Sequence, residues 1–328
     1  MLIRELKGSG LKGSGLKGSM WDAIAQQIEP QIEAITGQPF RIKHWKPVSG
    51  GCINEAFCIG DGMGDGMGDG TGDRQRYLVK LNQAGKAAMF EAEALGLQEM
   101  AAADCIRVPR PLCWGTVSTR SYLVLEWINF GQGTARQSGR SPNWSAMGQQ
   151  LAALHRSSAQ SFGWHRDNTI GETPQPNPWT QGWANFFAEW RIGFQLKLAA
   201  RNGGRFADAD ALLSAIPELL AGHDPQPSLV HGDLWSGNAA FDASGVPVLF
   251  DPATYYGDRE VDLAMTSLFG GFPEAFYQGY LEAWPLPSGY QQRKGLYNLY
   301  HVLNHFNLFG GSYFSQAQQM IRQLLVRV

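Results

Sequence analysis

The residues best suited to chemistry lie in HGDLWSGN at 231–238 and in VLFDP at 248–252. Asp233 and Asn238 are five residues apart, and Asp251 directly follows an apolar run. A carboxylate at the tip of a loop can orient a hydroxyl group and accept its proton. An amide oxygen and a second carboxylate can hold magnesium. The set therefore has what phosphoryl transfer from ATP requires, with Asp233 as the catalytic base and Asn238 and Asp251 as Mg²⁺ ligands.

The spacing of these residues matches the kinase catalytic loop H-x-D-L-x-x-x-N, with D-P-A in place of D-F-G. His231 stands two residues before Asp233, and Asp251 stands thirteen residues after Asn238. An H-G-D turn in which Asn238 caps a helix is the alternative. A simple turn does not require a second carboxylate after a β-like run, so the complete set favours a kinase.

Residues that could contact the nucleotide lie in the first half of the chain. Lys80 is near the end of the apolar run RYLVKL, and Glu93 follows thirteen residues later in FEAEALGL, which is rich in helix formers. We expect Glu93 to pair with Lys80 and to hold it toward the phosphates of ATP. Glu91 is the competing partner.

Two backbone segments complete the expected nucleotide site. In VSGGCINEAF, Gly50 and Gly51 stand where a phosphate-covering loop belongs, although G-x-G-x-x-G is absent. In LEWINF, the backbone groups of Glu126, Trp127 and Ile128 could hydrogen-bond an adenine edge.

The region around the catalytic loop indicates a small-molecule acceptor. Only six residues separate Asp251 from Asp258, whereas a protein kinase has a long activation segment there. Trp235 stands two residues after the catalytic Asp, where protein kinases commonly carry Lys or Arg, and an indole suits a sugar ring or an apolar organic body. Asp258, Glu260 and Asp262 favour an acceptor that bears an amine. For Asp262, a structural role in bracing the catalytic loop is the preferred interpretation.

Hydrophobic periodicity predicts the elements that must position these residues. In the first half it predicts helices at 21–36 and 87–103 and strands at 40–48, 53–59, 76–81, 108–117 and 121–128. From about residue 141 the pattern is mostly helical, with a strand-loop-strand stretch around HGDLWSGN. We therefore expect an α+β, bilobal protein-kinase-like fold. A small N-lobe (20–128), with an antiparallel sheet and one main helix, would bind the nucleotide, and a larger, mainly helical C-lobe (129–328) would carry catalysis and bind the acceptor.

Two segments stand outside these elements. Residues 1–19 repeat an LKGSG unit ahead of Met20 and resemble an expression tag or linker. Residues 60–73, GDGMGDGMGDGTGD, form a low-complexity insertion between two predicted strands. Calcium-binding nonapeptide repeats are also rich in Gly and Asp, but the unit here is a tetrapeptide and lacks their apolar residue. A flexible extension of a hairpin is the preferred interpretation.

Composition excludes several classes of protein. The 328 residues include 27 basic and 29 acidic side chains. Without residues 1–19, which hold four basic residues and one acidic residue, the net charge is −5, so a nucleic-acid binder is not expected. We expect no membrane association, because no apolar run reaches 18 residues. Four cysteines without a metal-ligand spacing indicate a reduced, cytoplasmic setting.

The motifs together resemble the fructosamine kinase, or ketosamine 3-kinase, family. The segments that carry this resemblance are HGDLWSGN, FDPATYYGDREVDLAM, QPNPWTQGWANFFAEWRIGFQL, VSGGCINEAF, FEAEALGL and LYHVLNHFNLFGG. They are spread over nearly the whole chain from Met20 onward, and they are specific to the family rather than general to kinases.

The resemblance implies the aminoglycoside-phosphotransferase-like version of the kinase fold. It also implies ATP-dependent phosphorylation of the 3-hydroxyl of ketosamines, the fructosamine or ribulosamine adducts of free amines and protein lysines. The product is unstable and sheds its sugar, so the implied role is deglycation repair. The match assigns Trp235 and Asp258 to the sugar site and agrees with the roles given above to the other residues.

Two other functions use the same residues. An aminoglycoside- or choline-type phosphotransferase would carry the same HGD…N…D set, although Trp235 and the GDRE segment favour a ketosamine. A nucleotide-binding regulator without catalysis is the second alternative. The chain retains every residue of the catalytic and phosphate-binding set, which argues against a silent regulator.

Three weaker features have competing structural explanations. Aromatic residues recur at helical spacing over 179–194, which favours a helix stripe that faces the core. His301 and His305 lie one helical turn apart, but packing is favoured over metal binding because no HExxH glutamate accompanies them. Cys52 lies in the glycine-rich segment, where its oxidation could block nucleotide binding or link two otherwise monomeric chains. The structural alternative is a small residue that fills a tight turn.

Overall fold

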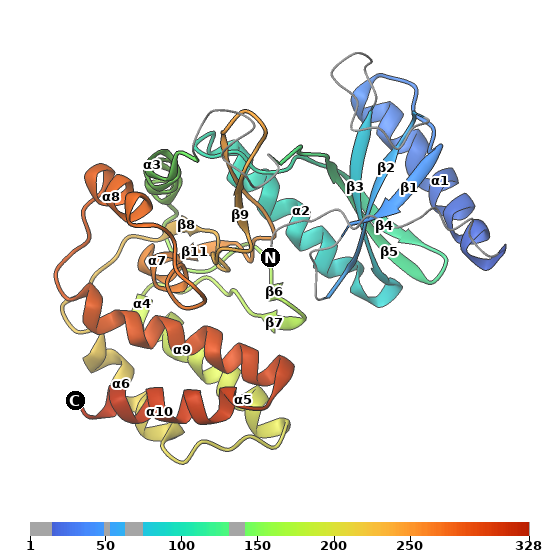
Figure 1. The fold of residues 1–328 in the computed structure, drawn as a ribbon. Coiled ribbons are helices and arrows are strands. Elements are labelled where there is room, and N and C mark those ends of the chain that lie inside the picture. The colour runs from blue at the N-terminus through green and yellow to red at the C-terminus, as the bar shows by residue number, and fades with distance from the viewer. Residues whose placement is uncertain (1–14, 49–52, 63–74, 131–141, 328) are drawn as a thin grey trace. The chain divides into compact units, whose positions relative to one another are not determined.

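The computed structural model describes residues 15–48, 53–62, 75–130 and 142–327. These residues form two compact units, whose elements are labelled in Figure 1. The first unit contains the chain up to residue 98 together with 108–130, and the second contains 99–107 together with the chain from 131 onward.

The first unit contains a five-stranded antiparallel sheet in the order β1-β2-β3-β5-β4. Its strands are β1 (His44–Pro47), β2 (Glu55–Gly60), β3 (Arg76–Gln83), β4 (Pro111–Val117) and β5 (Arg120–Glu126). All five predicted strands are therefore present, because alternating apolar residues give each strand a face to bury. The predicted insertion lies between β2 and β3, and its residues 63–73 lie outside the described part of the chain.

The first strand is shorter than predicted, and a neighbouring helix explains the difference. The backbone N–H of Phe40 donates to the carboxylate of Glu33 at 2.9 Å, and that of Ile42 donates to Glu29 at 2.7 Å. Backbone groups held by helix side chains cannot join the ladder. The strand expected at 40–48 consequently begins only at His44.

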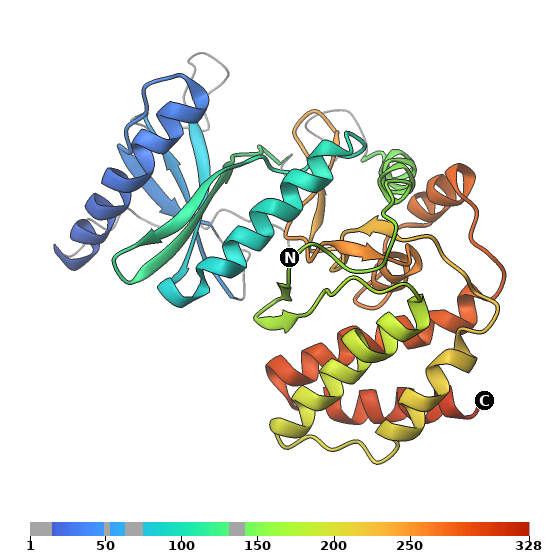
Figure 2. The ribbon, with the colours of Figure 1, turned by 180° about the vertical axis from the view of Figure 1, so that it is seen from behind.

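The helix α1 (Gly15–Thr36) lies against the sheet, as Figures 1 and 2 show. It begins six residues before the predicted start, inside the segment that resembles a tag. Its buried side chains join the same hydrophobic core as the inward-facing residues of the sheet: Trp21, Ile24, Ile28 and Ile32. After Thr36 the chain leaves the helix through Gly37 at φ +70°, a left-handed position that favours glycine.

The second helix, α2 (Ala87–Ala102), follows β3 through the short 3₁₀ turn η1 (Ala84–Lys86). The end of α2 and the residues up to 107 group with the second unit, although the sequence analysis placed them in the N-lobe. Hydrogen bonds explain this grouping. Leu249 N donates to the carbonyl of Arg107 at 3.0 Å, and the Arg107 guanidinium is paired with Asp242.

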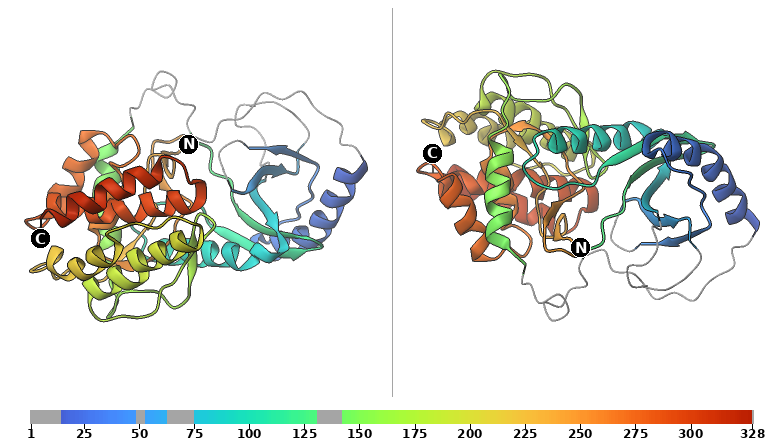
Figure 3. Two further views of the ribbon diagram at one scale, coloured as in Figure 1. Left: turned by 90° about the horizontal axis from the view of Figure 1, so that it is seen from below. Right: turned by 90° about the horizontal axis from the view of Figure 1, so that it is seen from above.

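The second unit is mainly helical, and with the sheet of the first unit it confirms the predicted α+β class. Its helices are α3 (Trp144–His155), α4 (Trp183–Phe186), α5 (Phe194–Arg201), α6 (Ala209–Leu219), α7 (Glu260–Met265), α8 (Glu274–Ala283), α9 (Tyr290–Phe309) and α10 (Tyr313–Leu325), with the π-helix η2 (Phe187–Gly193). Its short strands are β6 (Asn168–Ile170), β7 (Thr173–Gln175), β8 (Ser228–Val230), β9 (Ala239–Phe241), β10 (Pro247–Leu249) and β11 (Tyr255–Gly257). α9 and α10 lie side by side (Figure 3).

Two antiparallel strand pairs frame the loops that carry the predicted catalytic residues. β8 pairs with β11, and β9 pairs with β10. The loop 231–238 therefore leaves β8 and enters β9, while 250–254 leaves β10 and enters β11. The predicted strand-loop-strand arrangement is confirmed.

The aromatic stripe at 179–194 is a core feature for most of its length. Trp183, Phe186 and Phe187 are buried, as the periodicity predicted, whereas Trp179 is 51% exposed. His301 and His305 lie in the same unit on α9, where His305 Nδ1 is 2.8 Å from the carbonyl of His301.

Within the described ranges, no helix is both long enough and apolar enough to cross a membrane.

Candidate active site

The loop 231–238 begins with a tight turn that only glycine can make. Gly232 has φ +81°, and a Cβ at this position would lie 2.2 Å from the carbonyl oxygen of Ala253. Both the backbone angle and the close approach exclude an ordinary side chain. The glycine of the HGD motif is therefore required if Asp233 is to be presented next to the segment that contains Ala253.

Asp262 braces this turn, as predicted from the sequence. Its carboxylate accepts hydrogen bonds from the backbone N–H groups of His231 at 2.7 Å and Gly232 at 2.9 Å. His155 Nε2 lies 3.1 Å from the same carboxylate, and its Nδ1 lies 2.8 Å from the Tyr280 hydroxyl. Burial alone would raise the pKa of Asp262, but His155 and the backbone donors outweigh burial and lower it. Asp262 therefore stays ionised as a fixed acceptor.

Asp233 is half-buried at the tip of the loop. Asn238 Nδ2 donates to its backbone oxygen at 2.9 Å and to its Oδ2 at 3.3 Å. Burial and then the charge of Asp251 raise the pKa of Asp233 to about 7, although the Asn238 hydrogen bond partly offsets them. A carboxyl group with a pKa near neutrality is suited to proton transfer.

Asp251 joins this group from the other segment. It is exposed, and its backbone has φ +57°, a left-handed conformation that few residues other than glycine adopt. Asn238 Nδ2 lies 3.4 Å from the carbonyl oxygen of Asp251, and Phe250 N donates to the carbonyl of Asn238 at 3.1 Å. The structure therefore brings together all three residues that were predicted from the HGD…N…D spacing.

The described residues fit a magnesium site. The carboxylate of Asp251 raises the pKa of Asp233, so the two acids repel each other and a cation between them would relieve that repulsion. Carboxylate and amide oxygens are also the ligands that Mg²⁺ prefers. The role of Asn238 and Asp251 as ligands stays a prediction.

The expected phosphate-binding pair is present in the first unit. Lys80 on β3 and Glu93 on α2 form an ion pair, with Lys80 Nζ 2.6 Å from Glu93 Oε1. Both side chains are largely buried, which strengthens their attraction. The structure thus confirms Glu93 as a partner of Lys80. Contact with ATP stays a prediction.

The other predicted nucleotide residues are placed only in part. β5 ends at Glu126, whose N–H donates to the carbonyl of Arg110 at 2.8 Å, and Trp127 and Ile128 follow without regular structure. Their contact with adenine stays a prediction. Gly50 and Gly51 lie outside the described residues, as does Cys52.

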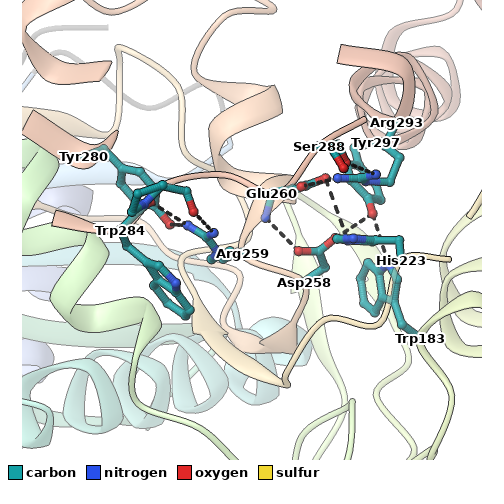
Figure 4. Close-up of polar contacts among 11 residues, drawn as sticks. Trp183, His223, Asp258, Arg259, Glu260, Tyr280, Trp284, Ser288, Arg293 and Tyr297 are labelled. Carbon is teal, nitrogen blue, oxygen red and sulfur yellow. Dashed lines mark hydrogen bonds and ion pairs between the residues drawn. The ribbon is translucent and has the colours of Figure 1, made fainter. Parts of the chain in front are cut away.

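The two predicted substrate residues differ in their surroundings. Trp235 is half-buried on the catalytic loop, and its backbone N–H donates to the backbone carbonyl of Asp233 at 3.2 Å. Asp258 is only 1% exposed. Its carboxylate accepts hydrogen bonds from Tyr297 at 2.6 Å, from His223 at 2.7 Å and from the N–H of Glu260 at 3.0 Å (Figure 4). A sugar contact stays a prediction for both residues. Trp235 is the stronger candidate, because Asp258 is buried and its carboxylate is already occupied by protein donors.

The cluster around Asp258 extends to a buried ion pair (Figure 4). Arg293 donates to both carboxylate oxygens of Glu260, at 2.8 and 2.6 Å. His223, Asp258 and Glu260 also have donor atoms within 4.8 Å of one another, a spacing that could hold a metal. Arg293 and Tyr297 already occupy the carboxylates, so the cluster fits a structural role.

Sequence reasoning missed the polar side chains that support the segment after Asp251. Gln175 Nε2 donates to the carbonyl of Ala253 at 3.1 Å, and Asn168 Nδ2 donates to that of Thr254 at 2.8 Å. These pairs are 78 and 86 residues apart in the chain. No local pattern signals them, because the partners are backbone carbonyls that any residue could supply.

Comparisons with known proteins agree with this geometry. A family model described as fructosamine kinase matches residues 20–327. The chain is 58% identical over 306 residues to the probable ketoamine kinase of Synechocystis, covering 93% of this chain and 97% of that protein. It is 40% identical over 295 residues to the chloroplastic protein-ribulosamine 3-kinase of Arabidopsis thaliana, covering 88% of this chain and 85% of that protein.

Solved structures support the same fold. The crystal structure of a candidate fructosamine-3-kinase from Haemophilus somnus 129PT matches with a TM-score of 0.81 and 33% identity, covering 93% of this chain and 97% of that chain. A thermostable mutant of an aminoglycoside phosphotransferase, in complex with ADP and hygromycin B, matches with a TM-score of 0.57 and 18% identity, covering 91% and 98%. That second likeness shows a shared kinase-like fold alone. Because the family model and the relatives cover nearly the whole chain, the chain belongs to the fructosamine kinase family.

Proposed function

We propose that this chain is an ATP- and Mg²⁺-dependent kinase that phosphorylates the 3-hydroxyl of ketosamines. The observation that carries the proposal is that Asp233 and Asn238, on a loop braced by Asp262, lie next to Asp251 on a second segment. The relatives named ketoamine kinase and protein-ribulosamine 3-kinase supply the substrate class. The role would be the removal of sugar adducts from amines and from protein lysines.

The mechanism assigns one task to each group. Asp233 orients the acceptor hydroxyl and takes its proton as the hydroxyl attacks the γ-phosphate, and its raised pKa suits that transfer. Asn238 and Asp251 would hold Mg²⁺, which neutralises phosphate charge when bound. Lys80, kept in place by Glu93, would contact the phosphates. Trp235 would lie against the sugar, because an indole offers a flat apolar face.

The test is magnesium-dependent release of ADP with ribulose-lysine and fructose-lysine adducts, run beside kanamycin and choline. We expect turnover with an adduct only. The Asp233→Asn variant should still bind ATP, but kcat should fall by about 10² to 10⁴, because the group that accepts the proton is lost. Asp210→Asn, which changes an exposed aspartate on α6, is the matched control and should retain the parent rate.

Other outcomes would overturn specific parts of the proposal. Turnover with kanamycin or choline alone would refute the ketosamine assignment and leave a phosphotransferase with another acceptor. ATP binding without turnover of any acceptor would favour a regulator. A parent-like rate in Asp233→Asn would remove Asp233 from the mechanism. A cytoplasmic location and a dimer linked through Cys52 stay predictions.

A further inference from the structure

The segment that follows Asp251 is held by the side chains of a distant hairpin. Asn168 opens β6 and Gln175 closes β7, and the two residues face each other in the ladder. Gln175 reaches the carbonyl of Ala253 and Asn168 reaches that of Thr254, the next residue. Both amide side chains are buried.

We propose that Gln175 and Asn168 are positioning residues of the phosphoryl-transfer reaction, which keep Asp251 in its working place beside the catalytic loop. This inference rests on the proposed kinase function. It adds to that function two residues that touch neither ATP nor the acceptor and act through the backbone at 253–254.

The backbone of this segment adopts an uncommon conformation at Asp251. Its φ of +57° is one that few residues other than glycine adopt, and such positions depend on the surrounding structure to fix the backbone. The next residue, Pro252, has no N–H to donate. Ala253 is therefore the first residue after Asp251 whose backbone N–H can fix the chain.

Ala253 joins the two catalytic segments. Its N–H donates to the carbonyl of His231 at 2.8 Å, and its own carbonyl lies against Gly232. Gln175 binds that same carbonyl from the hairpin side. A shift of the Ala253 peptide would therefore change the distance between the Asp251 segment and the loop that carries Asp233.

Neither positioning amide can turn around without losing other hydrogen bonds. Gln175 Oε1 accepts from the Tyr300 hydroxyl at 2.6 Å, so the Gln175 nitrogen must face Ala253. Asn168 Oδ1 accepts from Gln175 at 2.8 Å and from Asn177 at 2.9 Å, so the Asn168 nitrogen must face Thr254. The buried amides of Gln175, Asn168 and Asn177 each have partners for both oxygen and nitrogen, which specifies one arrangement of the three.

Arg191 anchors the far end of this network. It is fully buried on η2, and its Nη2 donates to Asn177 Oδ1 at 2.6 Å. Its guanidinium lies 4.0 Å from the ring centroid of Tyr255, the residue after Thr254. The network therefore holds the segment both through its carbonyls and through an aromatic side chain.

The test compares Gln175→Met with Gln195→Met. Gln195 is also fully buried in the second unit. Its amide bonds to Asn304 and Asn307 and it also contacts Tyr300, but none of these partners lies in 251–254. We expect Gln175→Met to speed amide hydrogen exchange in a peptide covering 249–256. We also expect kcat to fall about 10- to 100-fold while KM for the ketosamine changes by less than about threefold, because misplacement affects the reacting geometry. Gln195→Met should show neither effect at a similar loss of Tm.

A second variant keeps the test decisive if Gln175→Met does not fold. Gln175→Glu has the same shape, and burial favours its neutral acid, which donates one proton where the amide donates two. We expect it to retain part of the kcat and part of the exchange protection. If exchange over 249–256 in Gln175→Glu equals that of the parent, or if both Gln175 variants behave like Gln195→Met, the inference is wrong. Exchange is measured without substrate, so a parent that fails to turn over ketosamines would refute the proposed function separately.

Discussion

Two acids of like charge, Asp233 and Asp251, are brought together by a glycine and an amide. Gly232 permits the backbone to turn where any side chain would strike the Ala253 carbonyl. Asn238 then ties the Asp233 backbone to that of Asp251 through one NH₂ group. The placement of the two acids therefore depends on a residue without a side chain and on the amide that we also propose as a Mg²⁺ ligand.

Replacement of Gly232 by alanine tests this dependence. The added Cβ would meet the Ala253 carbonyl, at 2.2 Å, and the backbone would be strained at φ +81°. We expect Gly232→Ala to lower the free energy of unfolding by more than about 2 kcal/mol and to abolish turnover, because the loop must move. The measurements are urea unfolding and ADP release.

Gly245→Ala is the matched control. Gly245 has a similar φ of +86°, but a Cβ there meets no atom within 4 Å. It should lose only about 1 kcal/mol from backbone strain and keep the parent kcat. Equal behaviour of the two variants would show that the contact with Ala253 does not matter.

At the scale of elements, the start of α7 is fastened to α9 by the buried pair of Glu260 and Arg293 (Figure 4). Arg293→Met should lower the free energy of unfolding by about 3–5 kcal/mol, because it leaves the Glu260 carboxylate buried without its cation. The double variant Glu260→Gln with Arg293→Met should recover part of that loss, because no uncompensated charge remains. Denaturant unfolding of the parent and both variants measures the difference.

The control for this prediction is an exposed pair. Arg322 lies 3.9 Å from Asp208, and both side chains face solvent. Arg322→Met should change the unfolding free energy by less than about 1 kcal/mol. A loss in Arg293→Met as small as this would mean that the α7–α9 pair contributes little.

Local sequence patterns predicted part of the fold and part of the candidate site. The spacing of Asp233, Asn238 and Asp251 predicted their convergence because local motifs fix short loops, and alternation predicted five strands. The start of β1 was missed because Glu29 and Glu33 take backbone donors that a strand would use. Gln175 was missed because its partner is a carbonyl 78 residues away, and periodicity carries no information on such contacts.

At the scale of the whole molecule, buried histidines link stability to pH. Burial lowers the pKa of His301 to about 3, and it also lowers those of His231 and His305. A histidine with a depressed pKa stays neutral in the folded protein while the unfolded chain takes up a proton below pH 6.5. Its contribution to stability is therefore complete above pH 6.5 and is lost as the pH falls toward 3. Asp233, whose pKa is raised, acts in the opposite direction between pH 7 and 4.

The histidines and Asp233 have opposite effects on stability as the pH falls, so the effect of His301 is isolated by comparing the parent with a variant that lacks it. Between pH 7.5 and 5.5 the parent should lose about 1.4 kcal/mol of unfolding free energy relative to His301→Leu, which has no group to titrate. Urea unfolding of both proteins at the two pH values gives the quantity directly. A difference that does not change with pH would mean that His301 is protonated equally in the folded and unfolded chains.

The left-handed backbone of Asp251 also restricts what this position can become during evolution. Among residues other than glycine, only Asp and Asn enter that conformation readily. Gly would keep the turn but lose the oxygen ligand, Asn would keep the shape but lose the charge, and Glu would keep the charge but strain the turn. Descendants of this chain should therefore either retain Asp at this position or abandon the reaction. Asn or Gly at this site should mark lineages in which the kinase has decayed to a binding protein.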